Sequence, residues 1–242
     1  MIEKTSMLYW FPKIKDIDIP QPKTDIMQVN ATREAWVDFI DGKKDSLLEQ
    51  SSFIEEVRSR AEKIGYPLFL RTDQASGKHG WKNTCYVESK ENLIKNLKGV
   101  IEFSFMADIV GLPIDAVVFR EYIPMKNLFT AFHGEMPVNP EIRFFVKDGE
   151  ILCWHWYWIE DAIRNPSIEN WKEIIEKEKD DLFEEVNNFV RMSAQKIAIL
   201  FKDDGYWSVD FCKAKDGRWW LIDMADGFRS WHPENCEERL VK

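Results

Sequence analysis

Residues 207–227, WSVDFCKAKDGRWWLIDMADG, decide how the rest of the chain is interpreted. Two apolar, aromatic runs flank an Asp-Gly pair, and this dipeptide favours the tight turn of a β-hairpin. The run 207–213 also alternates in polarity, as a strand with one buried face does. If the hairpin is ungapped with a two-residue turn, Asp210 and Asp223 lie nearly opposite each other on its two strands.

Two carboxylates in such positions point to a divalent cation. Like charges directly opposite each other destabilise a sheet. A cation between them removes the repulsion, and Mg²⁺ is bound by one or two carboxylates together with substrate phosphates. Asp226 follows on what we expect to be the exit loop. The alternative is a solvated polar face, but these strands are apolar and aromatic for an exposed edge. We expect Asp210→Asn or Asp223→Asn to abolish metal-dependent binding and leave the fold intact, because neutralisation relieves repulsion.

Composition bounds the class of protein. A chain of 242 residues with 45% hydrophobic residues suits one large domain or two small lobes. The net charge of −9 counts against a general binder of nucleic acid or of anionic membranes. No apolar run approaches about eighteen residues, so we expect no membrane span. The four cysteines, one of them Cys236, show no metal spacing, and we interpret them as reduced thiols of a cytoplasmic protein.

The pattern of apolar residues predicts a mixture of helices and strands along the chain. In residues 7–29 it predicts a short strand followed by an extended segment around two prolines, and in 125–140 it predicts a loop. Helices are expected over 32–40, 46–64 and 167–201, with a short helix after Ser89 and strands over 66–72, 85–87, 116–124 and 141–158.

The loop DQASGKHGWKN, residues 73–83, follows the strand that ends near Arg71. It combines Ser76, Gly77 and Lys78 with a second glycine, Gly80. Flexible backbone with free N–H groups and a lysine suits a loop that covers phosphate. The loop does not match GxxxxGK[ST], and no helix is predicted to begin there. The alternative is an ordinary polar hairpin loop.

Charged residues also occur inside two apolar strands. AVVFREYIP carries Arg120 and Glu121, which either serve a site or project to solvent. In EIRFFVKDGEILCWHWYW, alternation places Glu141 and Arg143 on one face, and Asp148-Gly149 forms a second turn. We interpret His155 in the returning strand as a packed histidine outside any site.

The order of these pieces resembles the ATP-grasp fold over roughly residues 64–228. Its most specific parts are EIRFFVKDGEI and VDFCKAKDGRWWLIDMADG. The chain is similar to small ATP-grasp proteins of bacteria and phages without assigned substrates. It also resembles the eukaryotic ATP-grasp family that helps assemble translation initiation factor two.

The resemblance implies an α+β fold in which two lobes with antiparallel sheets grip ATP. The expected parts are a short N-terminal α/β region over 1–65, a small lobe with a glycine-rich flap over 66–124, and a large lobe with the metal-binding hairpin over 125–242. From this resemblance we expect the short region over 1–65 to stand in place of the full N-terminal domain of larger ligases.

The resemblance also implies roles for individual residues. Arg71 takes the place of the usual lysine on the α- and β-phosphates, and Ser76, Gly77 and Lys78 belong to the flap. The hinge that hydrogen-bonds adenine falls at Glu121, Tyr122 and Ile123. Arg143 faces the γ-phosphate, so Arg143 and Lys78 are the candidate catalytic residues.

Asp210 and Asp223 match the two acidic ligands of Mg²⁺ or Mn²⁺ in that family. The family pattern places an asparagine two residues after the second acid, where this chain has Ala225. Whether Asp226 replaces that asparagine as a metal ligand stays open.

The function expected first is an ATP-dependent carboxylate–amine ligase that works through an acyl phosphate. The alternative is an ATP-dependent assembly or remodelling factor for a protein partner, without ligase turnover. A third class, a phosphotransferase or nucleic-acid-end ligase, is disfavoured by the net charge of −9. The sequence does not name the acceptor substrate or partner, and it leaves the oligomeric state open, with a homodimer among the options.

Overall fold

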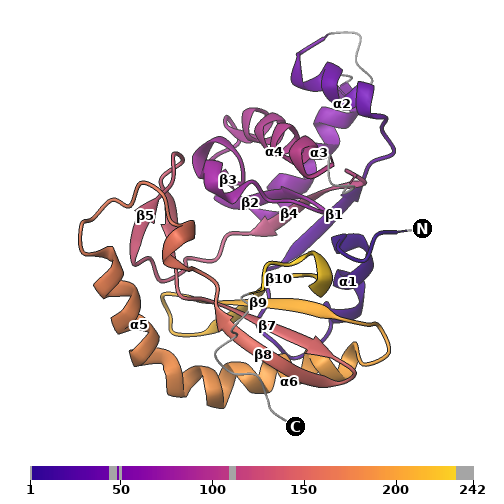
Figure 1. Ribbon diagram of the computed structural model, residues 1–242. Helices are drawn as coiled ribbons and strands as arrows, with labels where there is room; N and C mark the ends of the chain where they lie inside the picture. Colours follow the sequence, from indigo (N-terminus) through magenta and orange to yellow (C-terminus); the bar gives the residue numbers. More distant parts are fainter. Residues whose placement is uncertain (1, 44–47, 49–50, 109–112, 233–242) are drawn as a thin grey trace. The chain divides into compact units, whose positions relative to one another are not determined.

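The computed structural model describes residues 2–43, 48, 51–108 and 113–232 (Figure 1). The expected helix start at residue 46, the tail 233–242 and its Cys236 lie outside this range. The chain has an α+β architecture and divides into two compact units. Unit 1 comprises Met1–Leu8, Pro22–Ile123 and His133–Met136, and unit 2 comprises Tyr9–Gln21, Pro124–Phe132 and Pro137–Lys242.

Unit 1 contains a four-stranded antiparallel sheet in the order β1-β4-β2-β3. Its strands are β1 (Thr24–Gln28), β2 (Leu68–Thr72), β3 (Tyr86–Val87) and β4 (Ala116–Glu121). Its helices are α2 (Arg33–Ile40), α3 (Ser51–Ile64) and α4 (Leu93–Asp108). Alternation along β2 and β4 sends Leu68, Leu70 and Phe119 into a core with Trp36 and Val57. The opposite face of the sheet carries the arginines of these two strands.

Local sequence explains where the helices of unit 1 begin and end. Thr32 caps α2, because its Oγ1 accepts a hydrogen bond from the Ala35 N–H at 3.3 Å. Gly65 adopts φ +95° directly after α3, a backbone conformation that favours glycine. The predicted helix over 32–40 and the predicted strand over 66–72 are confirmed within two residues, and α4 is longer than the short helix expected after Ser89.

Unit 2 contains a second antiparallel sheet, in the order β10-β9-β7-β8. Its strands are β7 (Glu141–Lys147), β8 (Glu150–Trp156), β9 (Trp207–Lys213) and β10 (Trp219–Asp226). Helices α5 (Trp171–Glu185) and α6 (Arg191–Leu200) run along one face of this sheet (Figure 1). A π-helical turn, Val186–Val190, joins them within the predicted helical region. The segment expected to be a loop over 125–140 contains a short pair of strands, β5 (Phe129–Ala131) and β6 (Met136–Val138).

The strand expected at the start of 7–29 is wrong, because the segment forms helix α1 (Met7–Ile14). Within unit 2, Tyr9 stacks on Trp207 with ring centroids 5.9 Å apart, and its hydroxyl donates to Asp204 at 2.5 Å. Tertiary contacts of this kind override a short apolar run that has no clear period. Among the described helices, none combines the length and the apolar character needed to cross a bilayer.

Candidate functional site

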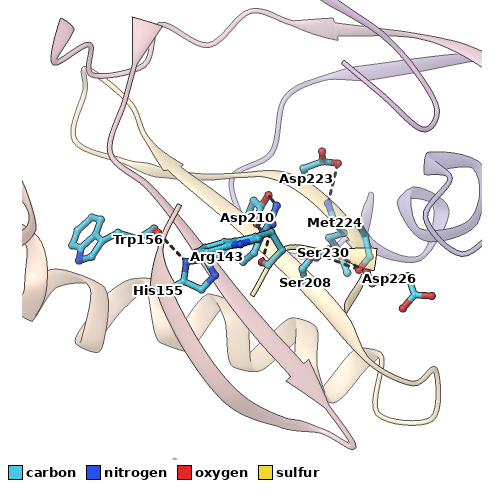
Figure 2. Close-up of polar contacts among 11 residues, drawn as sticks. Arg143, His155, Trp156, Ser208, Asp210, Asp223, Met224, Asp226 and Ser230 are labelled. Carbon is cyan, nitrogen blue, oxygen red and sulfur yellow. Dashed lines mark hydrogen bonds and ion pairs between the residues drawn. The ribbon is translucent and has the colours of Figure 1, made fainter. Parts of the chain in front are cut away.

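Four ionisable residues lie in one row across the sheet of unit 2. In the strand register, His155 of β8 is opposite Arg143 of β7, Arg143 is opposite Asp210 of β9, and Asp210 is opposite Asp223 of β10. Directly paired residues project to the same side of a sheet. These four residues, called the polar row below, therefore lie on the face opposite the one that packs on α5 and α6 (Figure 2).

Arg143 and Asp210 form the central contact of the polar row. The Arg143 Nε donates to Asp210 Oδ1 at 2.8 Å, and Nη2 donates to Oδ2 at 2.7 Å. The two side chains are only 12% and 6% exposed. Burial opposes the charged form of Arg143, but the charge and hydrogen bonds of Asp210 outweigh it and hold the pKa of Arg143 above its ordinary value. The Tyr157 ring lies 4.7 Å from the guanidinium carbon and adds a cation–π contact.

The expected pairing of Asp210 with Asp223 is confirmed, but the hairpin reaches it by a different route. Trp219 pairs with Lys213, so the first part of the hairpin is one residue out of the ungapped register. An irregularity between Leu221 and Asp223 then restores the register. One extra residue at Ile222 is a β-bulge, a feature frequent beside active sites. Because side chains alternate, the bulge also moves Asp223 to the face opposite that of Leu221.

Asp226 is the last residue of β10, so its expected position on an exit loop is wrong. Its register partner is Trp207, and its Oδ1 accepts from the Phe228 N–H at 3.0 Å, which caps a short 3₁₀ turn. Figure 2 shows its carboxylate pointing away from the Arg143–Asp210 pair. The strand register thus places Arg143, Asp210 and Asp223 side by side on one face of the sheet, with Arg143 and Asp210 in direct contact, and Asp226 does not join them.

The donor set of the polar row fits one divalent cation that is also bound by a ligand. Two opposed carboxylates, Asp210 and Asp223, supply oxygen atoms of the kind that Mg²⁺ and Mn²⁺ prefer. Across the described part of the chain, no three His, Cys, Asp or Glu side chains form a self-sufficient metal cage. Mg²⁺ in phosphate-binding sites needs no such cage, because phosphate oxygens and water complete its shell.

Two residues of unit 1 that we expect to bind nucleotide are Arg71, on strand β2, and Glu121, at the end of strand β4. Arg71 is buried on the face of β2 opposite Leu68 and Leu70, and its Nε donates to the Thr72 carbonyl at 3.1 Å. Glu121 ends β4, where its N–H donates to the Lys23 carbonyl at 2.8 Å.

The two residues after Glu121 are less exposed. The Tyr122 ring packs edge-on against Tyr86, with centroids 5.0 Å apart. Ile123 is buried. Tyr122 and Ile123, which we expected in the hinge, are therefore anchored by side-chain packing within unit 1.

The predicted flap is more ordered than an open loop. Gly77 takes φ +60° and precedes a 3₁₀ turn, Lys78–Asn83, so a helical turn does begin there, contrary to expectation. The Thr84 hydroxyl donates to the Gly77 carbonyl at 2.7 Å. The Gly134 N–H donates to the His79 carbonyl at 3.2 Å. Ser76 and Lys78 are both half-buried beside this turn.

Sequence reasoning left out two residues that the structure places beside the candidates. His155 belongs to the polar row and is 4% exposed. Arg120 is buried on the same sheet face as Arg71, and its Nε donates to Thr24 Oγ1 at 3.2 Å. Each of them is an ionisable residue inside an apolar strand, and this pattern in the sequence marks both as candidates. Only the strand pairing shows that they lie beside the other candidate residues.

Comparison with known proteins agrees with this architecture. The family model for the ATP-grasp domain, R-2-K clade family 3, matches residues 34–242. The chain belongs to this ATP-grasp family. No curated protein matches the sequence.

Solved structures resemble this chain at low sequence identity. Cdc123 from Schizosaccharomyces pombe superimposes with a TM-score of 0.55 and 16% identity, over 93% of this chain and 86% of that one. D-alanine–D-alanine ligase from Bacillus anthracis, complexed with ATP, gives a TM-score of 0.46 and 15% identity. That match covers 93% of this chain and 55% of the ligase, so this chain spans about half of the ligase's length.

Proposed function

We propose that this protein binds ATP with Mg²⁺ and acts as an ADP-forming carboxylate–amine ligase. The observation that carries the proposal is the polar row, where a forked guanidinium stands beside two opposed carboxylates. ATP is a polyanion, so carboxylates near its phosphates require a bound cation between them. Bound Mg²⁺ supplies charge neutralisation of the phosphates, and ATP supplies the phosphoryl group that activates a substrate carboxylate.

Each residue then has a defined task. Asp210 and Asp223 hold the cation, and Arg143 stabilises the charge on the transferred phosphoryl group through its planar donors. Arg71 and Lys78 bind the other phosphates, with Ser76 and Gly77 offering backbone beside them. Glu121, Tyr122 and Ile123 receive the adenine. Once the carboxylate carries phosphate, attack by an amine needs no nucleophile from the protein.

The test is ADP release from the full-length protein with Mg²⁺ and ATP. Pools of carboxylates and amines are offered together and separately. A ligase releases ADP only when both acceptors are present. Calorimetry of Mg²⁺–ATP in the same samples checks the binding step. If the protein does not bind Mg²⁺–ATP, or if ADP release is independent of both pools, the ligase proposal fails.

A second candidate function is ATP-dependent assembly or remodelling of a protein partner. It is favoured by the resemblance to the family that helps assemble translation initiation factor two and by the replacement of the family's asparagine by Ala225. Such a protein binds ATP and one macromolecule without steady turnover. Affinity capture with and without Mg²⁺–ATP separates the two functions, because a ligase captures no partner in stoichiometric amounts.

A further inference from the structure

His155, at the end of the polar row, has a ring nitrogen, Nε2, that makes no hydrogen bond with any of the described residues. Its Nδ1 lies 2.8 Å from the Trp156 carbonyl oxygen, and a carbonyl only accepts hydrogen bonds. Nδ1 therefore carries the proton, and Nε2 presents a lone pair. Within the described part of the chain, no hydrogen-bond donor reaches Nε2, although the residue is only 4% exposed. A buried acceptor left without a donor costs stability unless a ligand or water pairs with it.

The surroundings of Nε2 define the kind of group that fits there. Arg143 is the direct register neighbour of His155, and it commits Nε and Nη2 to Asp210. Its Nη1 makes only a long contact of 3.5 Å, with the Trp231 carbonyl. The Trp231 and His232 rings meet the imidazole edge-on. A ligand at this point meets a neutral acceptor beside a guanidinium, which favours an uncharged N–H donor over a cation.

The neutral state of the imidazole supports this assignment. Burial, with the Arg143 and His232 charges beside it, lowers the pKa of His155 to about 4. Near neutral pH the ring therefore accepts a hydrogen bond at Nε2 and does not donate one there. A nucleophilic amine must likewise be uncharged, and its N–H needs an acceptor that leaves the nitrogen lone pair directed at the electrophile.

We infer that His155 is a specificity-determining residue that binds the N–H of the uncharged amine substrate through Nε2, beside Arg143. The inference rests on the proposed ligase function and names the part of the site that selects an amine. It requires no bond to be made or broken by the histidine. His155 orients the amine, and the charge developed on phosphoryl transfer is met by Arg143.

The test uses hydroxylamine as a small uncharged amine and follows the ring nitrogens by ¹⁵N NMR in the full-length protein. The chain has four histidines, so His79, His133 and His232 serve as internal controls. Hydroxylamine is titrated with and without Mg²⁺ and a non-hydrolysable ATP analogue. We expect a saturable shift of the His155 Nε2 resonance only. If that resonance stays fixed in both titrations, or moves in parallel with the other three, a water molecule satisfies Nε2 and the inference is wrong.

Two variants separate binding from folding. His155→Phe removes the acceptor and keeps a ring, whereas His155→Gln keeps an acceptor near the Nε2 position. We expect His155→Phe to weaken hydroxylamine binding at least tenfold and His155→Gln to retain most of it. Equal hydroxylamine affinity in wild type and His155→Phe overturns the inference. If the wild type does not bind Mg²⁺–ATP, the proposed function is refuted instead. The hydroxylamine titration without nucleotide then still decides the role of His155.

Discussion

Arg143 commits two of its three guanidinium nitrogens to Asp210, so its forked geometry matters more than its charge. Arg143→Lys keeps the positive charge but loses the fork. We expect the variant to bind ADP nearly as well as wild type and to lose ATP turnover, or ATP-dependent action on a partner, by at least about tenfold, equivalent to about 1.4 kcal/mol. Steady-state kinetics and ADP calorimetry check this. Equal loss of ADP and ATP binding contradicts a role at the γ-phosphate.

The two carboxylates of the polar row are expected to respond differently to neutralisation. Asp210 is paired with a buried arginine, so Asp210→Asn leaves an uncompensated charge and costs about 3–5 kcal/mol of stability. The expectation that this variant leaves the fold unaffected is therefore withdrawn. Asp223 accepts from the Met224 N–H through Oδ1, and the Asn side chain keeps that acceptor. We expect Asp223→Asn to stay within about 0.5 kcal/mol of wild type while losing Mg²⁺-dependent ATP binding.

Urea unfolding and calorimetry, each with and without a chelator, test this difference. Equal Mg²⁺–ATP affinity in Asp223→Asn and wild type would falsify the metal role of Asp223. Equal stability of the two Asn variants contradicts the buried ion pair.

His155 makes stability depend on pH with a defined sign. Its pKa is lowered from 6.5 to about 4 in the folded chain, so the unfolded chain binds more protons between these values. The contribution is complete above about pH 6.5 and is lost as the pH falls towards 4. Arg143, Asp210 and His232 face the ring and remain in both proteins compared. Between those pH values we expect wild type to lose about 3 kcal/mol more stability than His155→Phe, measured by denaturant unfolding. Parallel pH profiles contradict this.

Among the elements, the flap is held from one side by the segment around Gly134. A Cβ at Gly134 lies 2.4 Å from the Gly80 carbonyl carbon, so Gly134→Ala displaces the flap. In wild type we expect amide exchange of residues 76–80 to slow when Mg²⁺ and an ATP analogue bind, because closure orders the backbone. Gly134→Ala should lose this protection and bind Mg²⁺–ATP at least several-fold more weakly, measured by hydrogen exchange and calorimetry.

The matched control is Glu135→Gln, which removes the exposed ion pair of Glu135 with Lys82 and leaves the close backbone contact intact. An exposed pair of this kind contributes about 0–1 kcal/mol. We expect Glu135→Gln to show the protection of wild type. If both variants behave alike, the backbone contact at Gly134 does not position the flap.

At the scale of the whole molecule, the described cysteines belong to the interior. Cys85, Cys153 and Cys212 are all nearly fully buried, and burial raises the pKa of Cys85 to about 12. A thiol reacts through its thiolate, so these three residues should react with a bulky thiol reagent only when the protein opens. Mass spectrometry of tryptic peptides after brief labelling, native and in denaturant, checks this. Rapid native labelling of Cys85 contradicts the described core.

Strand pairs separated by Asp-Gly turns could be predicted from the sequence, because turn chemistry and alternation agree there. The same signals brought Asp210 and Asp223 together. Helix α1 could not be predicted, because Tyr9 finds its partners Trp207 and Asp204 far along the chain. The place of His155 in the polar row also needed the β7–β8 register, which alternation within one strand does not reveal.

The bulge at Ile222 has a practical consequence for the tip of the β9–β10 hairpin. The bulge shifts the strand register by one residue between the tip and Asp223. The register at the tip therefore does not by itself determine that Asp223 pairs with Asp210. Asp216 and Gly217 lie in the turn between the strands, where a Cβ on Gly217 meets no atom of the described chain within 4 Å. The tip is thus a natural place to insert a short peptide tag or a fluorescent label, which would report on this sheet without shifting the polar row.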